Sequence, residues 1–259
     1  GDSYAQGQCV KNNENLKYLF EKKNLNILNL AIGGSGALIS SAIYREYSQK
    51  DVKTIIWFFY EGNDLIELED EISNVFLRKY LDNRLFKHNL IQKNKELDLF
   101  LEDYHNKLVS KSKKNIADWE SNVFKLNKLR NQFYKVLEYM FGKNDNLVYQ
   151  GDLENFEKIF EIFYSEIKSN NQELFFIYLP EHARYLDRKN NYIRDNYKSE
   201  IKNLITKDYV DVKFIDVHQE IFSEIDDFSE LFPKSGGHYS AKGYKLITNY
   251  ILNKIQWKI

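Results

Sequence analysis

Four short apolar runs constrain the fold of this chain more than any other feature of its sequence. They cover 25–32, 53–60, 173–179 and 212–217 and are rich in β-branched and aromatic residues. Their apolar residues are nearly continuous rather than alternating, as in strands buried on both faces of a parallel sheet. The sequence therefore predicts four parallel strands.

Helical patterns separate these runs. Apolar residues recur at three- and four-residue steps in 11–23, 36–49, about 65–170, 190–206 and 240–254. Strands that alternate with helices indicate βαβ units with right-handed crossovers, and helices on both faces of the sheet. We predict an α/β fold, and a length of 259 residues suits a single domain, 1–259, with a substantial core.

The insert, the net charge, the cysteine count and the longest apolar run limit the classes of protein to which this chain can belong. We interpret 65–150 as a helical insert that either caps a site or only adds structure. The net charge of −1 gives no support for a nucleic-acid partner. The single cysteine, Cys9, excludes an internal disulfide, and we expect it to be a small buried residue of the first helix. The longest apolar run falls well short of the ~18 residues of a membrane span.

The chain begins with Gly1-Asp2-Ser3, a triplet that by itself could form an ordinary turn. If Ser3 instead lies at a turn between a strand and a helix, an apolar strand must come before it. We therefore expect that a central strand is encoded just upstream of Gly1. A signal peptide or membrane anchor could have been removed with it, so the cellular compartment stays open, with membrane-anchored and extracytoplasmic locations both compatible.

A glycine-rich segment, "NLAIGGSG", follows the first apolar run and contains Gly33, Gly34 and Gly36. Glycines at such a place let the backbone approach a ligand and direct N–H groups toward it. A tight turn between strand and helix would need the same residues. The G-G-x-G spacing is not that of a dinucleotide-binding fingerprint.

The second apolar run ends in "FYEGND", with Gly62, Asn63 and Asp64. An asparagine amide at the end of a strand can donate to a developing oxyanion. Alternatively, Asn63 or Asp64 could cap the helix that follows.

The last segment of interest is "FPKSGGHYSAKGYKLI", in which His238 follows two glycines and precedes an amphipathic helix. Ser240 is placed to cap that helix. A histidine here could be structural, but a flexible loop at a helix entrance also suits a catalytic base.

These segments should meet at one place. The carboxyl ends of parallel strands form one edge of the sheet, where ligands bind, and Ser3, Gly34 and Asn63 each follow a strand. A serine, an imidazole, a backbone N–H and an amide together suit acyl transfer from an ester. In this interpretation His238 takes the proton of Ser3, and the amide and N–H groups stabilise the tetrahedral oxyanion.

The chain resembles the SGNH (GDSL) hydrolases. "GDS", "NLAIGG", "GND" and "HYSAKG" match four blocks of that family at Ser3, Gly34, Asn63 and His238, in the family's order. The resemblance implies a flavodoxin-like α/β/α sandwich and a Ser3 nucleophile activated by His238. It also implies an oxyanion hole made by the N–H groups of Ser3 and Gly34 and the Asn63 amide. "FFYEGNDLIELEDE" and "LFPKSGGHYSAKGY" resemble bacterial members with a membrane-anchored N-terminus.

One position departs from the family pattern. The family has an aspartate three residues before the histidine, and here that residue is Ser235. Asp226 and Asp227 are the nearby candidates for an acid that orients His238, and a Ser–His dyad is the alternative. The other four histidines lack metal-ligand spacing, and we predict no metal or cofactor. Arg184 and His182, in "PEHAR", are weaker candidates for substrate contacts.

We therefore predict a serine esterase, with removal of acetyl groups from a glycan as one version. An O-acyltransferase, in which a sugar hydroxyl replaces water, would use the same residues. A catalytically inactive glycan-binding or assembly protein on the same fold is the third interpretation. The partner is in each case a small-molecule or glycan ester or the glycan itself, without nucleic acid, and the oligomeric state stays open.

Overall fold

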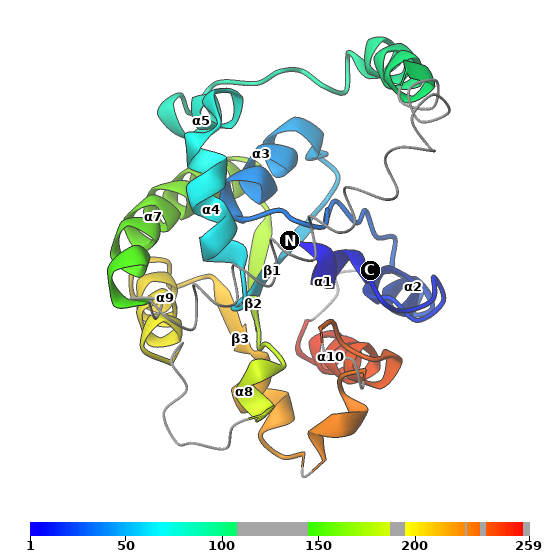
Figure 1. Cartoon of the computed structure of the whole chain (residues 1–259), viewed down its shortest axis with the longest axis vertical. Helices are drawn as coiled ribbons and strands as arrows, with labels where there is room; N and C mark the ends of the chain where they lie inside the picture. Colours follow the sequence, from blue (N-terminus) through cyan, green and yellow to red (C-terminus); the bar gives the residue numbers. More distant parts are fainter. Residues whose placement is uncertain (108–144, 187–194, 226, 234–236, 256–259) are drawn as a thin grey trace, which may run out of the picture. The chain divides into compact units, whose positions relative to one another are not determined.

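The structure is a computed structural model that describes residues 1–107, 145–186, 195–225, 227–233 and 237–255. Its sheet consists of three parallel strands in the order β1-β2-β3 (Figure 1). These strands are β1 (Thr54–Tyr60), β2 (Glu173–Leu179) and β3 (Lys213–Asp216). All three lie within predicted strands, so the α/β prediction is confirmed.

Helices cover both faces of this sheet. One face packs against α3 (Ala37–Tyr47), α4 (Asp64–Ser73), α5 (Val75–Asp82), α7 (Asp145–Ser169) and α9 (Asp195–Asp208). The other packs against α1 (Ser3–Gln6), α2 (Leu16–Glu21), the π-helical turn η1 (His218–Phe222) and α10 (Ala241–Lys254). Two short elements, α8 (Ala183–Leu186) and the 3₁₀ turn η2 (Phe228–Glu230), lie in the connections between them.

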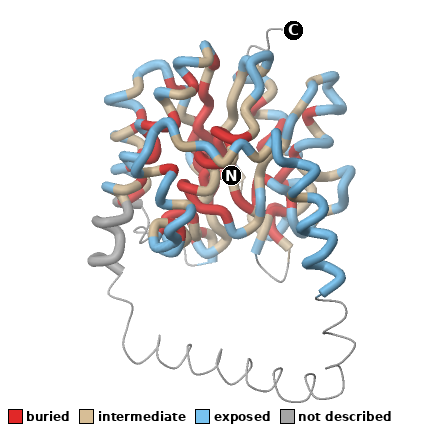
Figure 2. The backbone as a smooth tube through the Cα atoms, turned by 90° about the horizontal axis from the view of Figure 1, so that it is seen from above, coloured by how far each residue is buried: buried red, intermediate tan, exposed pale blue. Residues whose placement is uncertain are grey.

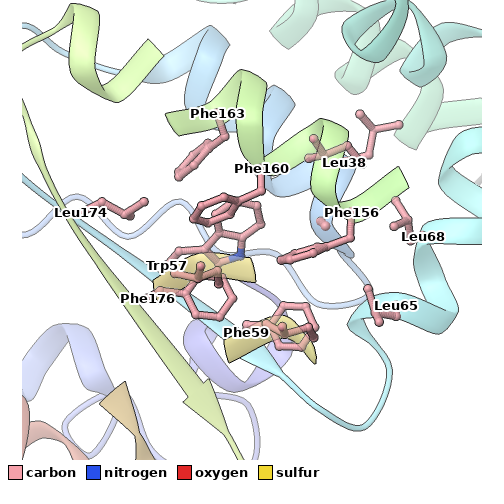
Figure 3. Packing of buried hydrophobic residues seen from close by; sticks show 14 of the residues in the cluster. Leu38, Trp57, Phe59, Leu65, Leu68, Phe156, Phe160, Phe163, Leu174 and Phe176 are labelled. Carbon is pink, nitrogen blue, oxygen red and sulfur yellow. The ribbon is translucent and has the colours of Figure 1, made fainter. Parts of the chain in front are cut away.

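Strand residues alternate between the two faces, which produces two separate cores. In β1, Trp57 and Phe59 belong to the core under α3 and α7, whereas Phe58 belongs to the core under α1 and α10. Figure 3 shows the first of these cores, where Trp57 and Phe59 meet Phe156 and Phe160 of α7. In Figure 2 the buried residues, in red, form the interior of this layered unit. Burial on both faces explains why these strands read as continuous apolar runs.

The predicted strand at 25–32 is wrong, because this segment forms no ladder with another strand. A strand requires a neighbouring strand at hydrogen-bonding distance, and 25–32 does not pair with β1. Ile32 N–H donates instead to the carbonyl of Gly1 (3.2 Å). The Asn29 side chain also fastens the segment to α1, by donating to the carbonyl of Ala5 (3.0 Å).

The chain divides into two compact units, one formed by 1–87 with 149–259 and the other by 88–148. The sheet and the predicted site residues that the structure describes belong to the first unit. Helix α5, and α4 apart from its first residue, lie within the predicted insert 65–150, yet both helices pack with α3 in the first unit. Within the second unit, a helix covers 94–107. No helix among the described residues is both long and apolar enough to cross a membrane.

Candidate active site

Ser3 is the first residue of α1, and its neighbours hold it there. The carboxylate of Asp2 caps the helix by accepting the N–H of Tyr4 (2.9 Å), and Asp2 is fully buried. Gly1 lies against β1, where a side chain would not fit, because an added Cβ would lie 2.9 Å from the carbonyl oxygen of Phe58. The serine is therefore fixed near the carboxyl end of β1.

His238 provides the second half of the site. Its Nε2 lies 2.7 Å from Ser3 Oγ, although 235 positions separate the two residues along the chain. The histidine directly precedes α10, which begins with Ser240 as its cap; the Ser240 hydroxyl accepts the N–H of Gly243 (3.2 Å). The predicted cap by Ser240 is confirmed. A serine hydroxyl and an imidazole at this distance can exchange a proton.

The surroundings of His238 favour its neutral form. Burial lowers the pKa of its imidazole, and the nearby Asp2 carboxylate opposes this effect. The ring of Tyr4 lies against the imidazole, with ring centroids 4.5 Å apart. Tyr4 also donates its hydroxyl to the carbonyl of Gly237 (2.9 Å), which ties the histidine loop to α1. A neutral imidazole can accept the proton of Ser3.

The group at the other ring nitrogen of His238 is Cys9. Its Sγ lies 3.3 Å from Nδ1. We assign the proton to Nδ1, because Nε2 must accept the Ser3 hydroxyl; Nδ1–H then donates to the sulfur. The prediction that Cys9 is buried in the first helix is wrong. Cys9 is exposed, lies beyond the end of α1, and has a left-handed backbone (φ +68°).

Asp227 is the candidate acid that the structure describes, and it is not the group at Nδ1 of His238. Asp227 is exposed, and its carboxylate accepts the N–H of Ser229 (2.9 Å) at the start of η2. The hydrogen bonds from Ser229 lower the pKa of Asp227. Asp226 and Ser235 lie outside the residues that the structure describes.

Asn63 precedes α4, but its side chain does not cap the helix. The amide donates to Oε1 of Glu67 (2.5 Å), one turn further along. Asp64 accepts the N–H of Tyr60 (3.1 Å) and is likewise not the cap. Glu67 is a residue that sequence reasoning missed, because its i+4 spacing from Asn63 recurs throughout any helix and is a weak signal. Burial raises the pKa of the Glu67 carboxyl.

The glycine segment lies in the connection from α2 to α3, and its N–H groups donate to side chains of α1 and α4. Gly34 has a left-handed backbone (φ +78°), and nothing lies within 4 Å of where its Cβ would be. The conformation, not the space, thus requires glycine. Gly33 N–H donates to the side chain of Gln6 (2.9 Å). Gly36 N–H donates to Glu71 of α4 (2.6 Å), and burial raises the pKa of Glu71 to about 7.

Arg184 is engaged elsewhere. Its guanidinium forms a buried ion pair with Glu61, with Nη2 2.6 Å and Nε 2.8 Å from the two carboxylate oxygens. This contact joins α8 to the end of β1 and leaves the arginine a structural role. His182 stacks on Phe232, with ring centroids 4.7 Å apart.

The described residues contain no group of three or more histidine, cysteine or acidic side chains that could hold a metal ion. No family model, curated protein or solved structure matches the chain. The contacts around Ser3 are therefore the features that indicate a function.

Proposed function

We propose that this protein is a serine hydrolase that cleaves ester bonds, and that it belongs with the SGNH hydrolases it resembles. The observation that carries the proposal is the 2.7 Å contact between Ser3 Oγ and His238 Nε2. A nucleophile within hydrogen-bond reach of a base, with a third group on the far side of that base, is the arrangement that activates a serine.

The reaction has two halves. Ser3 Oγ attacks the ester carbonyl while His238 Nε2 takes its proton, which gives a tetrahedral oxyanion. As that intermediate collapses, the C–O bond to the alcohol breaks and Nε2 returns the proton to the departing oxygen. Water then attacks the acyl-serine with Nε2 as base, and the same proton path releases the acid and restores Ser3.

In this proposal the N–H groups of Ser3 and Gly34 and the amide of Asn63 donate hydrogen bonds to the oxyanion. The support for this assignment is local: Ser3 begins α1, Gly34 lies in a turn that the bond from Gly33 N–H to Gln6 holds to α1, and Asn63 lies in the turn after β1. Because 25–32 is not a strand, Gly34 does not follow a strand as the sequence predicted. The Asn63 amide also donates to Glu67, so it must share or exchange that bond when an oxyanion forms.

A fluorophosphonate probe tests the proposal, since it labels activated serines without any assumption about substrate. We expect labelling of the unmodified chain at Ser3, shown by mass spectrometry, and none in Ser3→Ala. Ser73→Ala is the matched control, because Ser73 is exposed on α4 and only donates to the Glu69 carbonyl. Absence of labelling in the folded, unmodified chain would leave the inactive glycan-binding interpretation standing.

Hydrolysis and transfer are then separated by their products. The chain is incubated with an acetyl ester, with and without a glycan. Free acetate in both cases identifies an esterase, including a glycan O-deacetylase if acetylated glycan is also consumed. Acetylated glycan as the product identifies the O-acyltransferase.

A further inference from the structure

A buried glutamate of α4 caps the amino-terminal end of α3. The residue at the cap position of α3 is Gly36, which has no side chain to accept a hydrogen bond. The carboxylate of Glu71 accepts three backbone N–H groups instead, those of Gly36 (2.6 Å), Leu38 (2.9 Å) and Ile39 (3.3 Å). Glu71 is 5% exposed, so this contact is shielded from solvent. A negative charge at this end of a helix also interacts favourably with the helix dipole.

The same contact fixes one end of the glycine loop, 33–36. Gly36 approaches α4 so closely that an added Cβ would lie 3.0 Å from Oε2 of Glu71. The other end of the loop is held by α1, because Gly33 N–H donates to the Gln6 side chain (2.9 Å). Side-chain acceptors from two helices therefore hold the loop at its two ends.

Gly34 lies between these two attachment points. Its backbone is left-handed (φ +78°), and its N–H makes no hydrogen bond with any residue that the structure describes. Such an N–H group can stabilise an oxyanion only while it keeps its direction. Because glycine adopts many backbone conformations, release of Gly36 from α4 would let the Gly34 N–H turn away.

We propose that Glu71 is a positioning residue that works as a proton switch on the glycine loop. In its ionised form it holds the Gly34 N–H toward the oxyanion that forms at Ser3, and in its protonated form it releases the loop. Glu71 acts through Gly34 and not by contact with the substrate. The effect on catalysis rests on the proposed function, whereas the effect on the loop does not.

Protonation is the change that loosens this contact. An ionised carboxylate offers two acceptor oxygens to the three N–H groups, whereas a protonated carboxyl turns one of these oxygens into a donor. Burial is the main cause that raises the pKa of Glu71 to about 7, and the three N–H groups oppose this effect. The change in the contact therefore falls near neutral pH.

Few charged groups act on this carboxylate. Glu67, one turn earlier on α4, raises the pKa of Glu71 further. On the side of α1, the amino group of Gly1 interacts with the Glu71 charge. The charged residues of α3, Arg45 and Glu46, lie at the other end of that helix.

Amide NMR tests the switch without any assumption about catalysis. In the ¹⁵N-labelled chain we expect the signals of Gly34 and Gly36 to titrate together with a midpoint near pH 7. The titration should disappear in Glu71→Gln, because glutamine keeps the shape of the side chain but replaces one acceptor oxygen by an NH₂ group. Glu46→Gln is the matched control and should leave the titration in place. Glu46 is also a buried glutamate, and it accepts the Tyr80 hydroxyl (2.6 Å).

Kinetics measure the consequence for ester cleavage. Glu71→Gln should lower kcat by about 10–100-fold with little change in KM, because a misdirected donor is lost mainly in the transition state. Glu46→Gln should keep kcat within about twofold. In the unmodified chain kcat should fall as pH falls through about 7, and this fall should be absent in Glu71→Gln.

The outcomes separate this proposal from the proposed function. A Gly34 signal that does not respond near pH 7, or that responds equally in Glu71→Gln, would overturn the switch even if the probe labels Ser3. A response that Glu71→Gln abolishes, in a chain that no probe labels, would support the switch and reject the proposed function. An equal loss of kcat in Glu71→Gln and Glu46→Gln would overturn the positioning role, because both residues would then only stabilise α3.

Discussion

The base side of the site contains His238, whose imidazole lies 2.7 Å from the Ser3 hydroxyl, and the proposed donor side contains Asn63, whose amide donates to Glu67. The base side is held by packing: Tyr4 stacks on Tyr60, with centroids 3.8 Å apart, and its hydroxyl contacts the Tyr60 hydroxyl. The donor side is held by carboxylates and by a loop with a left-handed glycine. Packed rings have few alternative positions, whereas an amide shared with a carboxylate can change partners.

The two sides also differ in how they respond to charge. Burial is the main cause that raises the pKa of Asp2, Asp64 and Glu67, and the Asp2 charge raises the pKa of Asp64 and Glu67 further. An oxyanion forming beside ionised carboxylates would be repelled, whereas protonated carboxyls would not repel it. The base side gains from the Asp2 charge, because that charge supports the imidazolium form of His238. The two sides of the serine thus respond in opposite ways to the same acidic surroundings.

The largest expected effect comes from removing the base. His238→Gln keeps a polar side chain but cannot take up a proton, so kcat/KM for a p-nitrophenyl ester should fall by about 10³–10⁴. His182→Gln is the control, since His182 stacks on Phe232 and should leave the rate unchanged. A loss below about tenfold in His238→Gln would show that another group acts as base.

Loss of the proposed oxyanion donor Asn63 should have the second largest effect. Asn63→Ala should lower kcat by about 10²–10³ with little change in KM, because an oxyanion donor acts mainly in the transition state. Glu67→Gln separates charge from hydrogen bonding: a glutamine can still accept the amide of Asn63 but carries no charge, so kcat should not fall. A change in KM alone for Asn63→Ala would identify a substrate-binding residue.

The sequence predicts the strands that surround this site better than it predicts the contacts of the site residues. Strands β1, β2 and β3 are predictable because each is buried on both faces, which leaves a long apolar run. The segment 25–32 has the same composition but forms no strand, because pairing depends on a neighbour and not on composition. The meeting of Ser3 and His238 follows from the topology of a parallel sheet.

The contacts of Cys9 and Glu67 could not be predicted in the same way. Cys9 reaches His238 because the chain reverses after Gly7, which has a left-handed backbone (φ +86°), and again at Cys9 itself. A left-handed cysteine has no signature in the sequence. Glu67 lies at a helical spacing from Asn63, but that spacing occurs throughout any helix and does not single out a partner.

A smaller effect is expected at Cys9. Cys9→Ala removes the acceptor at His238 Nδ1, and the loss of one hydrogen bond should slow the probe reaction by about 2–10-fold. Cys9→Ser restores an acceptor of similar size and should recover most of the rate. If Cys9→Ala reacts at the unmodified rate, the sulfur does not orient the imidazole. If it loses all labelling, the thiol itself is the labelled nucleophile, and mass spectrometry will place the probe there.

The smallest expected effect is a shift in pH dependence caused by Asp2. Asp2→Asn keeps a cap for α1, because asparagine also accepts a backbone N–H, but removes the charge that raises the pKa of His238. Burial then acts alone, the pKa of His238 falls further, and the acid limb of kcat/KM should move to lower pH.

The stability of Asp2→Asn gives an independent readout. Since burial raises the pKa of Asp2, the folded chain holds that proton more tightly than the unfolded chain, and the stabilisation is lost as pH rises. Asp2→Asn should therefore raise Tm more at about pH 7, where Asp2 is ionised in the unfolded chain, than at about pH 4, where a larger fraction of Asp2 is protonated. An acid limb that stays in place while Tm responds as expected would show that the Asp2 charge does not reach His238, and that the two sides of Ser3 differ in packing alone.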